Sequence, residues 1–309
     1  MFDTVNLRIS RADISEGNTF GILPYLSDVT PPHLNKHGVE VANGKMLDYT
    51  AYINEWEIFL TGSLCKSFLG DNIQTLKRRA VKQAIEQLSD NLHIDLSTAK
   101  VTRLDVSTII PTKRPPADYY PYLGQKPYFE RLQSTPETLY YNNHQRQIVF
   151  YDKGKEARAK NMAIHAAFEN DNLFRYELRY TNRLNKQLKA DVTASTLYDE
   201  AFYRGVIQNW YNEFKTIQKL KNGNFMIEDI TTLKGAKDAL FASLLQEKGQ
   251  GFIDEILNDL RAANKFNSRS DYTKLRADLN KMLVSKNGNK ADLMQELETA
   301  FFNIAQYAR

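Results

Sequence analysis

The sequence predicts an α+β fold, in which a central antiparallel sheet with helices on one face is followed by an all-helical C-terminal domain. Up to about residue 190, apolar and polar residues mostly alternate over short runs, as in half-buried strands. After that point, apolar residues recur every three or four positions, as in amphipathic helices. The period changes between Asn182 and Thr193. We therefore predict two domains, residues 1–190 and 191–309.

The elements of the first predicted domain, residues 1–190, follow from the same patterns. Three prolines predict a loop over residues 20–37. Asp71 is suited to cap a helix over residues 73–91, whose apolar residues have helical spacing. Alternating residues predict strands over residues 4–9, 39–49 and 56–60.

The remaining elements of the sheet domain include a hairpin. Its two strands are residues 138–142 and 147–153, and a polar connection joins them. Strands are also predicted over residues 101–110 and 174–180, and a helix over residues 155–170. The C-terminal helices are predicted over residues 193–220, 233–245, 251–263, 272–283 and 291–307.

Composition and charge exclude several classes of protein. Of the 309 residues, 42% are hydrophobic and 25% are charged, which is typical of a globular protein and excludes a wholly disordered one. The sequence has no apolar run of about 18 residues and no basic segment before an apolar one at its N-terminus, so we expect neither a membrane span nor a secretory signal. The single cysteine, Cys65, excludes an intramolecular disulfide and favours the cytoplasm. A net charge of +4 does not by itself indicate a nucleic-acid partner.

Three of the predicted strands carry polar or charged residues on one face, because alternate side chains of a strand share a face. Two carboxylates in such a set offer the hard oxygen ligands that Mg²⁺ or Mn²⁺ prefers. Arginine and lysine offset phosphate charge, and a tyrosine becomes a nucleophile when a neighbouring cation lowers its pKa. The pattern therefore predicts a site for a metal and a phosphate. Its members are Arg103 and Asp105, then Tyr151 and Lys153, then Arg175, Glu177 and Arg179.

Plainer explanations of these residues stay open. A solvated sheet face gives the same alternation, and Glu177 between two arginines is also what a surface ion-pair ladder looks like. Asp105 can be an exposed partner of Arg103. Tyr151 is one of 17 tyrosines, most of which are expected to be packing residues. Its rivals as nucleophile are Tyr140, Tyr141 and the cluster at positions 119, 120 and 122.

Basic residues are concentrated around the predicted site. Residues 144–190 hold ten lysines and arginines against five acidic residues, an excess of 5 that is larger than the net charge of the whole chain. A groove that follows a phosphate backbone needs such a local excess.

Four short motifs carry a resemblance to a known family. The segment Thr138-Leu-Tyr-Tyr-Asn and, after it, Ile148-Val-Phe-Tyr-Asp-Lys-Gly-Lys-Glu156 resemble the tyrosine motif of rolling-circle replication initiators. The resemblance is to the gene II/X family of phage and plasmid replication proteins, the filamentous-phage type. The remaining motifs are Thr102-Arg-Leu-Asp105, Phe174-Arg-Tyr-Glu-Leu-Arg179 and the stretch from Thr61 to Asn72, in which Ser67 replaces an aromatic residue. All four occur in the family's order, within roughly residues 1–190.

The resemblance implies nicking and religation of one DNA strand at an origin. Tyr151 would attack a phosphodiester and stay joined to the 5′ phosphate, and Lys153 would stabilise charge at that phosphate. Asp105 and Glu177 would be the ligands of Mg²⁺ or Mn²⁺. DNA-binding residues would be Arg103, Lys155, Arg175 and Arg179. The implied partners are origin DNA, single-stranded or supercoiled, and a host helicase or polymerase.

A missing histidine pair and two rival functions leave alternatives open. Better-known initiators use a His-hydrophobe-His metal pair, and no two of the five histidines here form one, so the ligand set must be built from carboxylates, with or without a single histidine. A mobilisation relaxase at a transfer origin would use the same residues, and a DNA-binding regulator would use the same basic surface without chemistry. The helical domain contains a basic stretch at residues 265–286, and we predict that it binds duplex DNA; a scaffold or an oligomerisation surface is the alternative.

Overall fold

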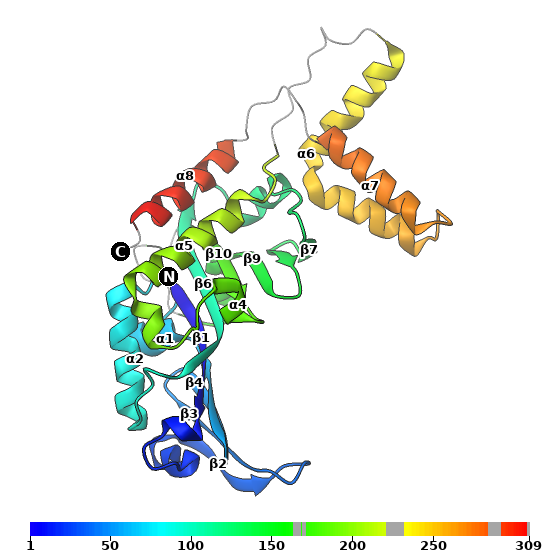
Figure 1. The fold of residues 1–309 in the computed structure, drawn as a ribbon. Coiled ribbons are helices and arrows are strands. Elements are labelled where there is room, and N and C mark those ends of the chain that lie inside the picture. Colours follow the sequence, from blue (N-terminus) through cyan, green and yellow to red (C-terminus); the bar gives the residue numbers. More distant parts are fainter. Residues whose placement is uncertain (163–167, 169–170, 221–231, 284–291, 308–309) are drawn as a thin grey trace.

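A ten-stranded antiparallel sheet dominates the protein, in a computed structural model that describes residues 1–162, 168, 171–220, 232–283 and 292–307 (Figure 1). The strand order is β2-β3-β4-β5-β1-β6-β10-β9-β8-β7, and the helices of the C-terminal region follow the last strand. The predicted α+β class is confirmed. The strands are β1 (Phe2–Ser10), β2 (Ser27–Leu34), β3 (Glu40–Met46), β4 (Tyr49–Asn54), β5 (Glu57–Gly62), β6 (Lys100–Thr112), β7 (Glu130–Thr135), β8 (Thr138–Asn142), β9 (Arg146–Asp152) and β10 (Asn172–Tyr180).

Helices lie before, between and after these strands. None of the described helices is long and apolar enough to cross a bilayer. The α-helices are α1 (Leu64–Leu69), α2 (Arg78–Leu92), α3 (Lys153–Ala159), α4 (Leu184–Leu188), α5 (Glu200–Lys215), α6 (Leu233–Ala262), α7 (Arg269–Leu283) and α8 (Asp292–Tyr307). Short 3₁₀ helices are η1 (Arg11–Asp13), η2 (Thr19–Tyr25), η3 (Pro116–Tyr122) and η5 (Ser195–Tyr198).

The two edge strands are elements that the sequence pattern did not predict. The expected loop over residues 20–37 contains β2, which pairs only with β3. Its prolines are tolerated because an edge strand has one row of unpaired backbone groups. The strand β7, at the other edge, has a mostly polar sequence and pairs only with β8. Edge strands lack the apolar alternation on which the prediction relied.

Several predicted elements have different bounds. The strand expected over residues 39–49 is the hairpin β3–β4, which turns where Leu47 adopts a φ of 53°. Asp71 accepts hydrogen bonds from the backbone of Ile73 and Gln74, but this turn is not continued and α2 begins only at Arg78. The predicted hairpin of β8 and β9 is confirmed.

Helix predictions after residue 150 also need correction. Of the helix expected over residues 155–170, α3 accounts for the start, and residues 163–167 and 169–170 lie outside the described residues. The two helices expected over residues 233–263 are one element, α6, with a kink at Gly249. Gly249 has a φ of 72°, and a Cβ there would lie 2.4 Å from the Cβ of Pro121 in η3, so glycine is required at this contact.

The main apolar core lies between one face of the sheet and the helices α2, α5 and α8. The Trp210 ring of α5 stacks on Tyr176 of β10 with a centroid distance of 4.7 Å. The ring centroids of Phe301 in α8 and Phe214 in α5 are also 4.7 Å apart. A smaller core, in which Leu245, Ile253 and Leu279 take part, holds α6 to α7. The predicted boundary at residue 190 therefore does not separate two cores, because α5 and α8 complete the core of the sheet.

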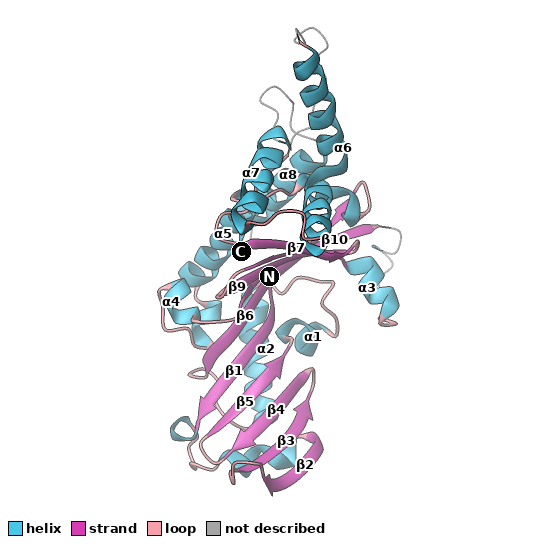
Figure 2. Ribbon diagram, turned by 90° about the vertical axis from the view of Figure 1, so that its right-hand side faces the viewer, coloured by secondary structure: helices cyan, strands magenta, loops and turns pink. Residues whose placement is uncertain are grey.

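The opposite face of the sheet is open along β1 to β5, as Figure 2 shows, with α2 behind the strands. Along β4 the exposed residues Thr50 and Tyr52 alternate with the buried residues Ala51 and Ile53. This open face is where the charged faces of the central strands lie.

Packing of α8 on the sheet gives a stability prediction. Phe301→Ala should lower the free energy of unfolding by about 3–5 kcal/mol, because the ring is fully buried among other aromatic rings. Its neighbour Phe302 is 46% exposed, and Phe302→Ala is the control, with an expected loss below about 1 kcal/mol. Urea unfolding followed by tryptophan fluorescence measures both. Equal effects of the two substitutions would contradict the assignment of α8 to the core.

Candidate functional site

Six charged residues form one connected set on the open face, across β1, β6 and β10. The register places Arg179 opposite Asp105 and Glu177 opposite Ser107, so side chains from neighbouring strands meet on the same face. We call this set the arginine–carboxylate cluster: Asp3, Arg103, Asp105, Arg175, Glu177 and Arg179.

Each carboxylate of the cluster is held by arginine. Arg103 donates two hydrogen bonds to Asp105, at 2.9 and 2.7 Å. Arg179 donates to Glu177 Oε2, with an Nε–Oε2 distance of 2.8 Å, while Arg175 donates to Glu177 Oε1 from 3.1 Å. The bidentate pair of Arg103 with Asp105 fixes the plane of that guanidinium group.

Burial divides the cluster into a hidden and a displayed part. The side chains of Asp105 and Glu177 are 2% and 4% exposed, whereas those of Arg103 and Arg179 are 35% and 26% exposed. Arg175 is buried with the carboxylates. Two guanidinium groups therefore face solvent, and the negative charges that orient them do not.

A divalent metal does not fit Asp105 and Glu177 as they are arranged. All four of their carboxylate oxygens already accept hydrogen bonds from guanidinium groups. Among the residues that the structure describes, no group of three His, Cys, Asp or Glu side chains is placed to hold a metal ion. These two carboxylates are positioned as partners of arginine, and a requirement for Mg²⁺ or Mn²⁺ stays a prediction.

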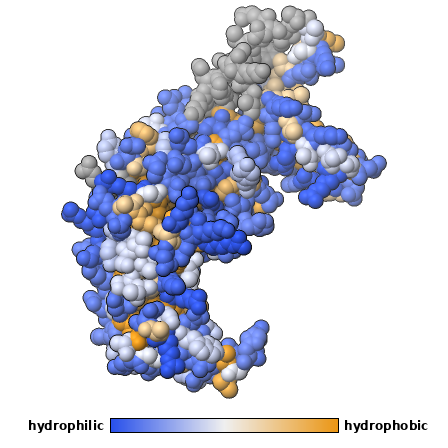
Figure 3. All heavy atoms as spheres, in the orientation of Figure 1, coloured by the Kyte–Doolittle hydropathy of each residue, from blue (hydrophilic) through white to orange (hydrophobic). Residues whose placement is uncertain are grey.

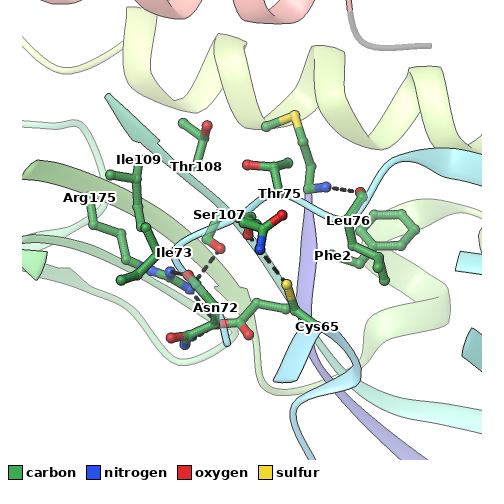
Figure 4. A pocket seen from close by; sticks show the side chains of 13 residues that line it. Phe2, Cys65, Asn72, Ile73, Thr75, Leu76, Ser107, Thr108, Ile109 and Arg175 are labelled. Atoms are coloured by element: carbon green, nitrogen blue, oxygen red, sulfur yellow. Dashed lines mark hydrogen bonds and ion pairs between the residues drawn. The ribbon is translucent and has the colours of Figure 1, made fainter. Parts of the chain in front are cut away.

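The buried end of the cluster is built around Arg175. Its guanidinium group donates to the Asn72 carbonyl at 2.7 Å and to the Ser107 hydroxyl at 2.8 Å, and it also bonds Asp3. Ser63 donates to Asp3 at 2.6 Å. A cavity of about 10 Å³, enough for one water molecule, adjoins these groups (Figure 4).

The partners of Arg175 were not predicted from the sequence. Ser63 and Asn72 both lie in the stretch from Thr61 to Asn72 that carried one motif of the resemblance, so the motif is explained by the support of a buried arginine. Ser107 shares the face of Asp105, which was a usable signal. No feature of the sequence pointed to Asp3, because only the pairing of β1 with β6 brings it near Arg175.

Tyr151 lies next to this buried end, on β9 and opposite Arg175. The guanidinium carbon of Arg175 is 5.8 Å from the centre of the Tyr151 ring. Burial raises the pKa of the Tyr151 phenol, and the charge of Arg175 acts against that rise. Arg175 is thus placed to favour the phenolate, although its burial prevents the direct DNA contact that was expected of it.

A groove of about 380 Å³ runs along Tyr151 on the protein surface, and we call it the Tyr151 groove. Lys155 and Arg179 bring positive charge to it, and Glu137, Asp152 and Glu156 bring negative charge. Its other lining residues are Thr138, Tyr140, Val149 and Ala159.

Lys153 and Lys155 have different surroundings although both follow Tyr151 closely. The Asp152 side chain caps α3 by accepting from the backbone of Lys155. Lys153 is buried, and its ammonium group lies 2.6 Å from Glu156. Burial and the nearby Arg175 lower the pKa of Lys153. Lys155 is exposed and lines the Tyr151 groove, whereas Lys153 does not line it.

The rival tyrosines are mostly engaged elsewhere. The hydroxyl of Tyr141 donates to backbone carbonyls in the core, at 2.9 and 2.7 Å. Tyr119 donates to Glu296 and Tyr120 to the Glu137 carbonyl, and both rings are buried. Tyr140 alone among these rivals lines the Tyr151 groove.

Comparison with known proteins adds one match. A family model for the N-terminal region of the gene II-type phage replication-associated protein matches residues 1–200. No curated protein matches the chain. The matched residues contain all ten strands, the arginine–carboxylate cluster and the Tyr151 groove.

Asp105 gives a prediction for the pH dependence of stability. Burial raises its pKa from 3.8 to about 6, against the opposing effect of Arg103. The folded state therefore binds this proton more tightly than the unfolded state, and the stabilisation is full below about pH 4 and lost as the pH rises through about 6. The wild type should lose roughly 3 kcal/mol of stability relative to Asp105→Asn between about pH 3 and about pH 7, a range that covers both pKa values.

Urea unfolding of both proteins across this pH range measures the difference, since all other titrating groups are shared. A stability difference that does not change with pH would mean that Asp105 keeps an ordinary pKa.

Proposed function

The chain belongs to the family of gene II-type phage replication-associated proteins, and we propose that it initiates replication by nicking and rejoining one DNA strand at an origin. The observation that supports this proposal is the placement of Tyr151 in a groove with Lys155 and Arg179, beside the buried Arg175. The proposed setting is the cytoplasm of a bacterial host, with origin DNA as substrate and host replication enzymes as partners.

In the proposed reaction, the Tyr151 phenolate oxygen attacks the phosphorus of one phosphodiester. An O–P bond to tyrosine forms and the bond to the 3′ oxygen of the preceding nucleotide breaks, so that oxygen takes up a proton and the phenol has lost one. The products are a 5′-phosphotyrosyl link and a free 3′ hydroxyl. Attack by a 3′ hydroxyl reverses the step and rejoins DNA without an energy source, because the phosphodiester is conserved.

Positive charge in the groove would serve the transition state. Lys155 and Arg179 can bind the non-bridging oxygens on which negative charge accumulates. Arg175 favours the phenolate of Tyr151 from the buried side. Asp105 and Glu177 would act indirectly, without contacting DNA. They hold the Arg103 and Arg179 side chains in fixed orientations, so that these side chains need little reorganisation when DNA binds.

Duplex binding by the C-terminal helices stays a proposal for α6 and α7 alone. These helices have their own small core and contact the sheet edge through Asp254, which bridges the buried Arg131 of β7 and Arg276 of α7. Residues 284–286 of the basic stretch lie outside the described residues. A truncation that spares the sheet must keep α5 and α8, because both complete its core.

The nucleophile is tested by Tyr151→Phe, which keeps the ring and removes the attacking oxygen. Incubated with supercoiled origin DNA and Mg²⁺ or Mn²⁺, this variant should give no open circles and no covalent protein–DNA adduct, while DNA binding stays within about twofold. Tyr140→Phe, in the same groove, is the matched control and should keep the adduct. Denaturing gels and peptide mapping measure the adduct. Adduct formation by Tyr151→Phe would place the nucleophile elsewhere, and no nicking by the wild type would favour a non-catalytic regulator.

The role of Asp105 is tested by binding without metal. If Asp105 holds Arg103 for DNA, then Asp105→Asn and Arg103→Ala should each weaken the binding of single-stranded DNA in EDTA by several-fold. The double variant should be little worse than either alone, because the two residues act as one pair. Fluorescence anisotropy measures the affinities. Unchanged binding in EDTA together with lost metal-dependent nicking would make Asp105 a metal ligand instead.

A further inference from the structure

A second group of side chains lies on the open face, away from the Tyr151 groove. In the register of β1, β5 and β4, Arg8 stands opposite Phe59 and Phe59 stands opposite Tyr52. The two ring centroids are 6.2 Å apart, and the Arg8 guanidinium carbon is 5.7 Å from the Phe59 ring. We call Arg8, Phe59 and Tyr52 the aromatic platform.

The platform is not part of the core of the protein. Its neighbours in sequence, Leu7, Ile58, Leu60 and Ile53, are buried on the helix-covered face. Tyr52 remains 36% exposed, and Arg8 is exposed. The rings therefore stand on the face that no helix covers along β1 to β5 in Figure 2.

Cationic groups connect the platform to the Tyr151 groove. Asn6 and Arg103 are register partners between β1 and β6, and Arg103 and Arg179 both contact Asp105. Glu57 pairs with Arg8 and is largely buried. The solvent side of this path thus presents guanidinium groups, and the carboxylates that bind them lie below.

We infer that unpaired DNA flanking the scissile phosphate crosses this open face, from Tyr151 past Arg179 and Arg103 to the aromatic platform, where its bases stack on Phe59 and Tyr52. The inference rests on the proposed nicking function and adds the substrate form and its track. Aromatic rings combined with a cationic path are the usual means of binding single strands, because every base has a π face that a ring can cover. A duplex keeps those faces stacked and cannot use the platform.

The shape and size of the face suit such a strand. Figure 3, which sees this side edge-on, shows that the outline of the molecule is hollowed between the end that carries β2 and the helices α6 and α7. From β9 to β4 the track crosses five strand spacings, or at least about 24 Å at ~4.8 Å per strand. That length accommodates several nucleotides, so a short strand around the nick would not reach the platform.

The test measures binding in the Tyr151→Phe background, so that no cleavage interferes. The probes are fluorescent origin oligonucleotides: one of about six nucleotides centred on the nick, and two that extend it by about ten nucleotides on the 5′ or the 3′ side. Tyr52→Ala/Phe59→Ala should weaken binding of one of the two extended strands at least tenfold and leave the short strand unaffected. For the wild-type platform, annealing a complementary strand to that extension should remove the increase in affinity that the extension gives.

Tyr25→Ala is the matched control, because Tyr25 is a comparably exposed ring that packs on His93 behind the sheet. It should bind all probes normally, and thermal melting should show that each variant is folded. Unchanged binding of both extended strands by Tyr52→Ala/Phe59→Ala would overturn the track, as would an equal loss on the short strand. The readout does not depend on the nucleophile: an adduct that persists in Tyr151→Phe would refute the proposed nicking residue and leave the binding result intact.

Discussion

The buried guanidinium group of Arg175 is the constraint on which the site depends. It binds Asp3 on β1, Ser107 on β6, Glu177 on its own strand and the backbone of Asn72, and its charge lies under the Tyr151 ring. A buried charge is tolerated only when its partners are complete, because an unpaired ion in the interior costs several kcal/mol. The same group therefore fixes the spacing of three strands and sets the electrostatic surroundings of the proposed nucleophile.

Local patterns were sufficient for much of the fold. The strict alternation of Phe174 to Tyr180 identified β10, and the helical spacing around Trp210 identified α5. Local patterns could not show which elements share a core. The apolar stripe of α8 is equally compatible with a separate helical domain, and only its packing on Tyr176 and Phe214 assigns it to the sheet.

The candidate site was predictable in its members more than in their roles. Alternation placed Arg103, Asp105, Glu177 and Arg179 on one face, and they do meet there. The arginines that bind these carboxylates lie two residues away on the same strands, so the pairs themselves were visible in the sequence. What the sequence could not show is that both carboxylates are buried and that all four of their oxygens are occupied. Burial of Arg175 was likewise invisible, because the segment before α2 contacts it from a distant part of the sequence.

A sheet is suited to this arrangement because its two faces carry separate tasks. The apolar face is fixed by large aromatic residues, so the strands cannot shift in register without moving those rings out of the core. The polar face inherits that rigidity: each arginine stands at a set distance from its neighbours, and buried carboxylates fix its orientation. A flexible loop of arginines would have to be ordered when DNA binds, whereas here the cost of ordering is met during folding. The long sheet then extends the same rigid surface to β4 and β5, so that the proposed chemistry at Tyr151 and the inferred base stacking at Tyr52 would share one surface.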